Sequence, residues 1–303
     1  MTSLLEEFNK KSLRALSKSI SAAENRDPNV LEMLSELYDQ TGRARIFGIT
    51  GPPGAGKSTL VSHFVKYIRQ KKQSVAVIAV DPMSPFTGGA LLGDRIRLID
   101  HFNDDKVFIR SLSTRGKLGG LSVASRQVID LVDAFGFDYV IVETVGVGQS
   151  EVDIRNLADA TLVVLVPEAG DSIQTIKAGL LEIADLFLIH KSDREGAEKL
   201  QNSLADVVRF ADKQTPVLLS SIQREQSIEA VFKSLNTFYE KQQPLIRERK
   251  KTAAKTAIVE LLESELARAA HKWVDKKVQA PHNPYTFVKD FWKNHSVDKF
   301  FSQ

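Results

Sequence analysis

The sequence contains no cysteine, and none of its apolar stretches approaches the roughly 18 residues of a membrane-spanning helix. Without cysteine the chain has neither disulfides nor thiolate metal ligands, and a reducing compartment is the simplest expectation. The N-terminal residues carry acids instead of a basic stretch and an apolar run, so we expect no secretory leader. These absences favour a cytoplasmic protein without a membrane partner.

The chain also has little net charge. Its 41 basic and 38 acidic side chains leave a formal charge of +3. Because nucleic-acid binding usually requires a concentration of basic residues, we expect no nucleic-acid partner. The 303 residues, 43% of them hydrophobic, are enough for one large domain or two ordinary ones.

Residues 51–58, Gly-Pro-Pro-Gly-Ala-Gly-Lys-Ser, match the phosphate-binding loop (P-loop) pattern G-x-x-x-x-G-K-[ST] in full. An apolar run at 44–50 predicts a strand before the loop, and helical spacing of apolar residues at 60–68 predicts a helix after it. Such a loop directs backbone N–H groups and the helix dipole at an anion, with Lys57 on the β- and γ-phosphates and Ser58 on Mg²⁺. The sequence therefore predicts a nucleoside triphosphate site. The residues expected to contact the phosphates are Gly51, Pro52, Gly54, Ala55, Gly56, Lys57, Ser58 and Thr59.

Strand-like and helical runs alternate along the middle of the chain. The strand-like runs are 44–50, 75–80, 107–110, 138–143, 161–166, 185–190 and 216–220. Because they are rich in β-branched residues and nearly all apolar, they predict an α/β fold with a mostly parallel, doubly wound sheet covered on both faces. In such folds, ligands bind beyond the carboxyl ends of the strands.

Helical extensions are expected on both sides of this α/β domain. Apolar residues at helical spacing, with a break at 25–28, predict a helical hairpin over 1–42. The α/β domain is assigned to 43–240. Residues 241–303, with a long helix at about 248–277 and an aromatic tail, are interpreted as a helical appendage that serves for dimerisation or docking, or packs on the core.

Three carboxylates lie at strand ends or in the loop between them. Asp81 follows the run 75–80, Glu143 ends the run 138–143, and Asp94 lies between them. Because Mg²⁺ prefers oxygen ligands and keeps several waters, we assign these carboxylates, with Ser58, to a metal site. The competing interpretation of each is a carboxylate that caps a helix or a turn.

Gly146 follows the buried strand in the segment Glu143-Thr144-Val145-Gly146. A glycine at this point can turn its N–H toward a γ-phosphate without obstruction by a side chain. We therefore expect the segment 146–151 to change its order on hydrolysis. The competing interpretation is an ordinary turn between a strand and a helix.

The segment His190-Lys191-Ser192-Asp193 resembles the guanine-reading motif Asn-Lys-x-Asp. A carboxylate at Asp193 can accept hydrogen bonds from two guanine donors that adenine does not offer together, and Lys191 can lie along the base. His190 departs from the motif, although an imidazole N–H can replace part of the missing amide. A second segment, Ser221-Ile222, lies where a Ser-Ala pair usually supports the base.

Together these motifs resemble the MeaB/ArgK group of P-loop GTPases. The resemblance rests on segments 48–59, 80–95, 142–151 and 167–185 and covers about 40–240. It implies a GTPase that binds GTP or GDP with Mg²⁺ and docks on an adenosylcobalamin-dependent methylmalonyl-CoA mutase. There it would gate loading of the cobalamin cofactor and protect the mutase.

The expected catalytic set is Lys57, Glu143 and Lys177, the last of them implied by the resemblance. Lys177 matches a functional lysine in a mobile loop of the group, and its competing interpretation is an exposed helix lysine. Segment 241–303 differs from the group's usual dimerisation arm, so a homodimer and the identity of the client mutase stay open. The alternative functions are a metallocentre-maturation GTPase, such as a nickel inserter, and a P-loop kinase. The first would require clustered imidazole or soft ligands, and the second an acceptor site with a lid.

Overall fold

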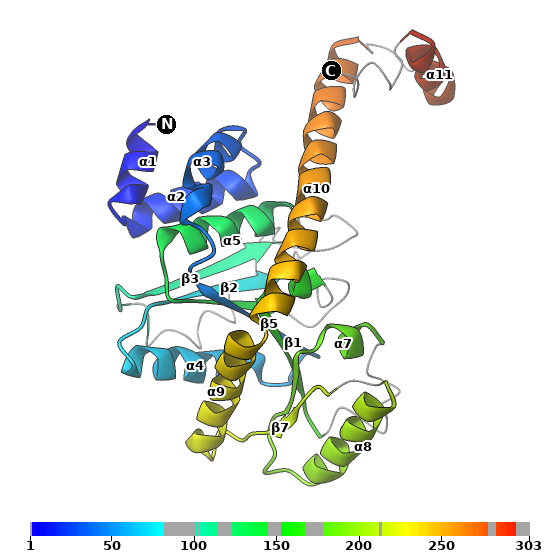
Figure 1. Cartoon of the computed structure of the whole chain (residues 1–303). Helices are drawn as coiled ribbons and strands as arrows, with labels where there is room; N and C mark the ends of the chain where they lie inside the picture. Colours follow the sequence, from blue (N-terminus) through cyan, green and yellow to red (C-terminus); the bar gives the residue numbers. More distant parts are fainter. Residues whose placement is uncertain are drawn as a thin grey trace. The chain divides into compact units, whose positions relative to one another are not determined.

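The computed structural model describes residues 2–81, 101, 103–113, 123–144, 153–167, 178–211, 214–277 and 283–294. The chain divides into two units, Met1–Ala254 and Lys255–Gln303. The first unit contains a seven-stranded sheet in the order β3-β2-β4-β1-β5-β6-β7 (Figure 1). The strands are β1 (Arg45–Thr50), β2 (Val75–Asp81), β3 (Val107–Ser113), β4 (Tyr139–Thr144), β5 (Ala160–Leu165), β6 (Leu186–Ile189) and β7 (Val217–Leu219).

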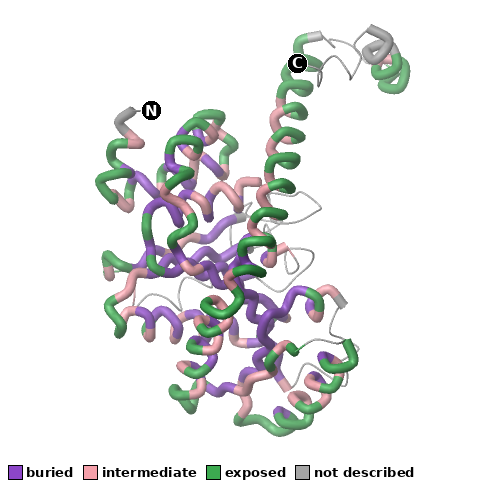
Figure 2. The backbone as a smooth tube through the Cα atoms, viewed as in Figure 1, coloured by how far each residue is buried: buried purple, intermediate pink, exposed green. Residues whose placement is uncertain are grey.

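All neighbouring strands in this sheet are parallel, which confirms the predicted fold class. Every residue of β4 and β5 is buried, as expected for strands covered on both faces (Figure 2). In the register, Ile49 of β1 pairs with Glu143 of β4, and Thr50 pairs with Val163 of β5. The carboxyl end of β1 therefore lies between the ends of β4 and β5.

Helices cover the sheet on both faces (Figure 1). On one face, the core is built around the aromatic rings of Phe64 and Phe232, whose centroids are 5.2 Å apart. On the other, the core includes Leu16 and Val132. The helices of the first face are α4 (Lys57–Gln70) and α9 (Glu225–Lys241), and those of the second include α2 (Leu13–Glu24), α3 (Asn29–Leu37) and α5 (Val123–Phe135). Further elements of this unit are η1 (Tyr38–Gln40), η3 (Ile154–Asn156), α7 (Ala178–Ile183) and α8 (Ala197–Phe210).

The N-terminal region differs from the predicted hairpin of two helices. The first apolar run is divided into α1 (Thr2–Asn9) and α2, because Lys11 has the left-handed φ of 62° and Ser12 caps α2 by accepting from the N–H of Ala15. Lys11 then donates its ammonium to the carbonyl of Phe135, at the end of α5. Apolar spacing carries through such a break, so the spacing did not reveal it.

Two buried carboxylates connect the start of α10 (Gln243–Lys277) to the amino ends of strands. Asp185 accepts from the N–H of Thr161 and from two guanidinium nitrogens of Arg249, at 2.8 and 3.0 Å. Asp159 forms an ion pair with Lys250 at 2.7 Å. These contacts lie within the first unit, at the amino ends of the strands, whereas the P-loop lies at their carboxyl ends.

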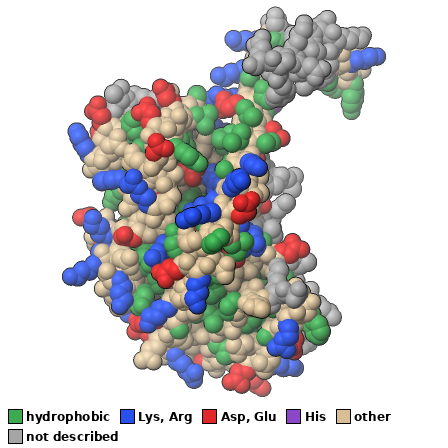
Figure 3. All heavy atoms as spheres, viewed as in Figure 1, with side chains coloured by type: hydrophobic (Ala, Val, Ile, Leu, Met, Phe, Trp, Pro, Cys, Tyr) green, Lys and Arg blue, Asp and Glu red, His purple; other side chains and the backbone are tan. Residues whose placement is uncertain are grey.

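The second unit contains the remainder of α10 and the helix α11 (Pro284–Asn294). The ring centroids of Trp273 and Phe287 lie 5.9 Å apart. The domain boundaries expected at residues 42 and 240 stay a prediction. No helix among the described residues is long and apolar enough to cross a membrane. On the face drawn in Figure 3, basic and acidic side chains are interspersed.

Candidate nucleotide site

The predicted P-loop joins the end of β1 to the start of α4. Its glycines 51, 54 and 56 have positive φ values of 136°, 77° and 88°. A Cβ on Gly51 would lie 2.1 Å from the carbonyl oxygen of Val164, so a larger residue has no space there. Helix α4 then begins at Lys57, so its N-terminal N–H groups lie directly after the loop, as an anion site requires.

Lys57 folds back over this loop. Its ammonium donates to the carbonyl of Gly51 at 2.7 Å and to that of Pro52 at 2.9 Å. The residue is 7% exposed. A lysine in this position places a positive charge within the curve of the loop, where the phosphates are predicted to bind.

The structure brings together two of the residues predicted to hold Mg²⁺. Ser58 donates its hydroxyl hydrogen to Oε1 of Glu143 at 2.8 Å, and both side chains are buried. One residue comes from the first turn of α4 and the other from the end of β4. A hydroxyl and a carboxylate are hard oxygen donors, so the pair fits Mg²⁺ in chemistry.

Thr50 and Thr144 form a further contact that the sequence analysis missed. Their hydroxyl oxygens lie 2.9 Å apart, and both residues are fully buried. They end the neighbouring strands β1 and β4, so strand pairing indicates the contact once the strand order is known. The contact links the strand before the P-loop to the strand before the segment that contains Gly146.

The predicted base-reading segment lies beside the P-loop. The ammonium of Lys191 donates to the carbonyl of Gly54 at 2.9 Å. Nδ1 of the buried His190 lies 2.8 Å from the hydroxyl of Ser220. Burial, with a smaller effect of the Lys191 charge, lowers the pKa of His190 to about 4. The ring is therefore neutral at physiological pH.

Asp193 and Ser221 are also brought together. The hydroxyl of Ser221 donates to Oδ1 of Asp193 and lowers the pKa of this exposed carboxyl group. Ser221 is buried, whereas the neighbouring Ile222 is 51% exposed. The charged carboxylate is thus held in place at the end of β6, where a base donor can approach it.

The structure does not place several of the predicted site residues in this site. Asp94, Gly146 and Lys177 lie outside the described residues, as does the side chain of Asp81. The backbone of Asp81 ends β2, next to β4 in the sheet. Among the other predicted contacts, Ala55 is fully buried, whereas Pro52 and Thr59 are partly exposed. The carbonyl of Pro52 accepts from Lys57 and from the N–H of Ala55, so Pro52 and Ala55 both take part in the turn of the loop.

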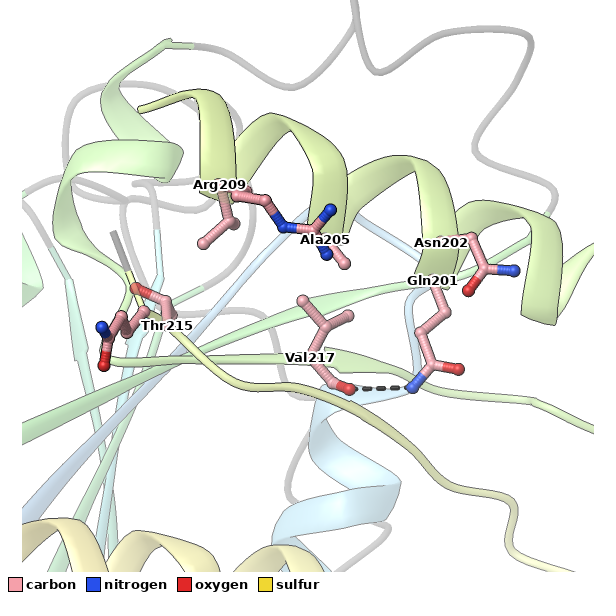
Figure 4. A pocket seen from close by; sticks show the side chains of 8 residues that line it. Gln201, Asn202, Ala205, Arg209, Thr215 and Val217 are labelled. Atoms are coloured by element: carbon pink, nitrogen blue, oxygen red, sulfur yellow. Dashed lines mark hydrogen bonds between the residues drawn. The ribbon is translucent and has the colours of Figure 1, made fainter. Parts of the chain in front are cut away.

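A separate pocket lies between α8 and β7, and Gln201 crosses it to donate to the carbonyl of Val217 at 2.9 Å (Figure 4). None of the predicted site residues lines this pocket. Its lining residues are Gln201, Asn202, Ala205, Val208, Arg209, Gln214, Thr215 and Val217.

The parallel sheet, the glycine loop and the buried Ser58–Glu143 pair define a protein of the P-loop nucleotide-binding class. More specifically, residues 16–274 match the family model described as methylmalonyl Co-A mutase-associated GTPase MeaB. The chain belongs to this family of GTPases, as the resemblance of its motifs had indicated.

Named relatives agree with this membership. A relative from Pyrococcus horikoshii is named as a GTPase. It is 55% identical over 195 residues, which are 64% of this chain and 62% of the relative. The GTPase ArgK of Escherichia coli is 36% identical over 74% of this chain and 71% of its own length. The methylmalonic aciduria type A homolog of Mus musculus is 38% identical over 62% of this chain and 46% of its own length. The match therefore spans less than two thirds of the Pyrococcus relative.

Solved structures show the same fold. A crystal structure of a LAO/AO transport system kinase is similar with a TM-score of 0.70 and 22% identity, over 96% of this chain and 97% of the other. The nickel complex of HypB from Helicobacter pylori is similar with a TM-score of 0.51 and 18% identity, over 72% of this chain and 96% of the other. At these identities, the similarity concerns the fold alone.

Proposed function

We propose that this protein binds GTP with Mg²⁺ and hydrolyses it to GDP and phosphate. The buried Ser58–Glu143 pair is the observation that carries this proposal, because it places two oxygen ligands where the P-loop enters α4. In this role Ser58 binds the metal, and Glu143 binds it directly or through a water. Bound Mg²⁺ would neutralise the charge that develops on the phosphates.

Besides Mg²⁺, the ammonium of Lys57 supplies a positive charge to the proposed phosphate site. A nucleotide would exchange its contacts with the carbonyls of Gly51 and Pro52 for contacts with phosphate oxygens. The exchange is favoured because a phosphate oxygen carries a negative charge, which attracts the ammonium more strongly than the dipole of a neutral carbonyl does.

Guanine selection is assigned to Asp193, with Ser221 as its support and Lys191 along the base. The carboxylate can accept from two donors on guanine, and the hydroxyl of Ser221 fixes one of its oxygens. Lys191 also contacts Gly54, so the base site and the P-loop share a residue.

We further propose that the nucleotide state controls binding to an adenosylcobalamin-dependent acyl-CoA mutase of the methylmalonyl-CoA type. The family description names this mutase, and the mouse relative carries the name of methylmalonic aciduria type A. In the proposed cycle, Glu143 and Thr144 lead into the segment 146–151, which begins with Gly146. Loss of the γ-phosphate would change that segment and, with it, the surface seen by the mutase during cofactor loading and protection.

Calorimetry with GDP and ADP, followed by hydrolysis assays with and without a methylmalonyl-CoA mutase, tests both parts of the proposal. We expect preference for GDP and hydrolysis that the mutase accelerates. Lys57→Ala should abolish binding, whereas Lys199→Ala, at an exposed position on α8, should not. Equal affinity for ADP would contradict the guanine site, and mutase-independent hydrolysis without complex formation would contradict the partner.

The same assays address the two alternatives. The described residues contain no group of three or more side chains suited to a metal ion, so no observation there favours a nickel inserter. Stoichiometric binding of nickel would nevertheless support it. Transfer of the γ-phosphate to a metabolite instead of water would identify a kinase.

A further inference from the structure

His190 occupies the position where the guanine motif carries asparagine. Its contacts extend from the strand ends of the sheet to the P-loop. The residue follows β6, and its backbone N–H donates to the carbonyl of Leu165 at 2.8 Å. It is 2% exposed, and Nδ1 of its ring lies 2.8 Å from the hydroxyl of the fully buried Ser220. The position and the rotation of the imidazole are therefore fixed by the ends of three strands, β5, β6 and β7.

The opposite side of this ring faces the P-loop. A Cβ on Gly56 would lie 2.7 Å from Cδ2 of His190 and 3.2 Å from Nε2. Gly56 has a φ of 88° and is the residue immediately before α4, whose first residues are Lys57 and Ser58. The imidazole thus fills the space beside the glycine that starts the phosphate-binding helix.

The next residue provides a second contact with the same loop. Lys191 has a φ of 57°, and its ammonium donates to the carbonyl of Gly54. Its Cε would lie 3.9 Å from a Cβ on Gly56. Two consecutive residues of the base segment therefore hold two alternate glycines of the P-loop.

We propose that His190 is a positioning residue that holds the P-loop in its phosphate-binding shape, and that it couples recognition of the base to recognition of the phosphates. The inference rests on the proposed function, since it concerns the same nucleotide. An imidazole suits this role because its nitrogens point in different directions, so one can bind Ser220 while the other side of the ring packs on Gly56. A neutral ring also fits the surroundings, because a cation there would face Lys191 and His63, opposed by the carboxylate of Asp193.

The first experiment compares the affinities for GDP and GMP by calorimetry in wild type, His190→Ala and Asp193→Ala. If His190 shapes the P-loop, His190→Ala lowers the GDP:GMP affinity ratio at least tenfold, because binding of the β-phosphate is lost. Asp193→Ala is the matched variant from the same segment, and it should weaken both ligands by a similar factor. An unchanged ratio in His190→Ala would overturn the proposal.

The second experiment uses the protein without nucleotide. Hydrogen exchange of residues 51–58 should be faster in His190→Ala and in Ser220→Ala than in wild type, and unchanged in His271→Ala, at an exposed position on α10. His190→Asn, checked for folding by circular dichroism, provides a milder change and should give an intermediate rate. Unchanged exchange in folded variants would also overturn the proposal.

These two experiments separate the inference from the proposed function. If wild type failed to prefer GDP over ADP, guanine selection would be wrong, while the exchange experiment would still test the contact between His190 and Gly56. If wild type bound GDP normally and exchange at 51–58 ignored His190, only the positioning role would be wrong.

Discussion

The hydroxyl of Ser58 donates to Oε1 of Glu143 across 2.8 Å, and this contact joins the first turn of α4 to the end of β4. Both side chains are buried, so removing either partner would deprive the other of this hydrogen bond in the protein interior, where water replaces it poorly. The sequence separation of these residues is 85, and the parallel pairing of β1 with β4 helps to bring them together.

Glu143→Gln tests the role of the carboxylate charge. A glutamine keeps the size of the side chain and an oxygen that can accept from Ser58, but it removes the charge that would hold Mg²⁺. We expect GTP hydrolysis to fall on the order of 100-fold, as when one group that stabilises transition-state charge is lost. The unfolding free energy should change by about 1 kcal/mol or less. The exposed Glu225→Gln is the control, and equal hydrolysis rates in the two variants would contradict the metal role.

Arg249→Met tests the ion pair between Arg249 and Asp185, at the amino end of β6. The substitution keeps much of the side-chain volume and leaves Asp185 buried with the N–H of Thr161 as a remaining donor. Breaking one side of a buried ion pair typically costs about 3–5 kcal/mol, and the remaining donor places our expectation at the lower end. Chemical denaturation measures the change. Arg209→Met removes an exposed ion pair with Asp206 and should cost below about 1 kcal/mol.

Gly51→Ala tests the close approach of the P-loop to β5. The new Cβ would lie 2.1 Å from the carbonyl oxygen of Val164, in addition to the strain of a positive φ. Gly42→Ala provides the matched control, because Gly42 has a φ of 82° and a Cβ there would meet no atom within 4 Å. We expect Gly51→Ala to be less stable than the control by about 1–3 kcal/mol, the usual cost of overpacking. Equal losses would show that the loop relaxes without cost.

The depressed pKa of His190 predicts a pH dependence of stability. The pKa is about 4 in the native state against 6.5 for an unperturbed histidine, so over this interval the unfolded chain holds a proton that the native chain lacks. Stability from His190 is complete above about pH 6.5 and falls as the pH decreases toward 4, by an amount on the order of 3 kcal/mol. His190→Gln cannot titrate there. The difference in unfolding free energy between wild type and His190→Gln should therefore shrink from pH 7 to pH 4.

Asp130 adds a pH dependence of its own to the stability curve of each protein, although it cancels in their difference. Burial raises its pKa from 3.8 to about 6, so the native chain holds a proton that the unfolded chain lacks over that interval. Its contribution thus favours the native state as the pH decreases, opposite in sign to that of His190. Asp130→Asn removes this contribution. A wild-type curve that His190→Gln merely displaces, without a change in slope, would contradict the assignment to His190.

The sequence alone predicted the sheet and the phosphate loop because both depend on local patterns. Apolar β-branched runs specify buried strands, and the loop pattern specifies backbone geometry through its glycines. The division at Lys11 was missed because a left-handed residue leaves no trace in apolar spacing. The confirmed fold class then follows from the alternation of strands and helices.

The contacts of the candidate site were harder to predict than its residues. Motifs named Ser58 and Glu143 separately, but their hydrogen bond depends on strand order. The packing of His190 against Gly56 depends on how the segment after β6 and the P-loop lie relative to each other in space. The pairing of Thr50 with Thr144 depends on the register of β1 and β4. These are tertiary properties that no local pattern encodes.

The all-parallel sheet also has a consequence for how the chain reaches its native state. No two of the described strands can pair through a tight turn, and central β1 pairs with β4 and β5, which begin at Tyr139 and Ala160. Closing such long loops costs entropy before the contacts repay it, so this pairing slows folding relative to a sheet built from hairpins. Nascent chains must therefore wait until more than half of the polypeptide has been synthesised before the centre of the sheet can assemble.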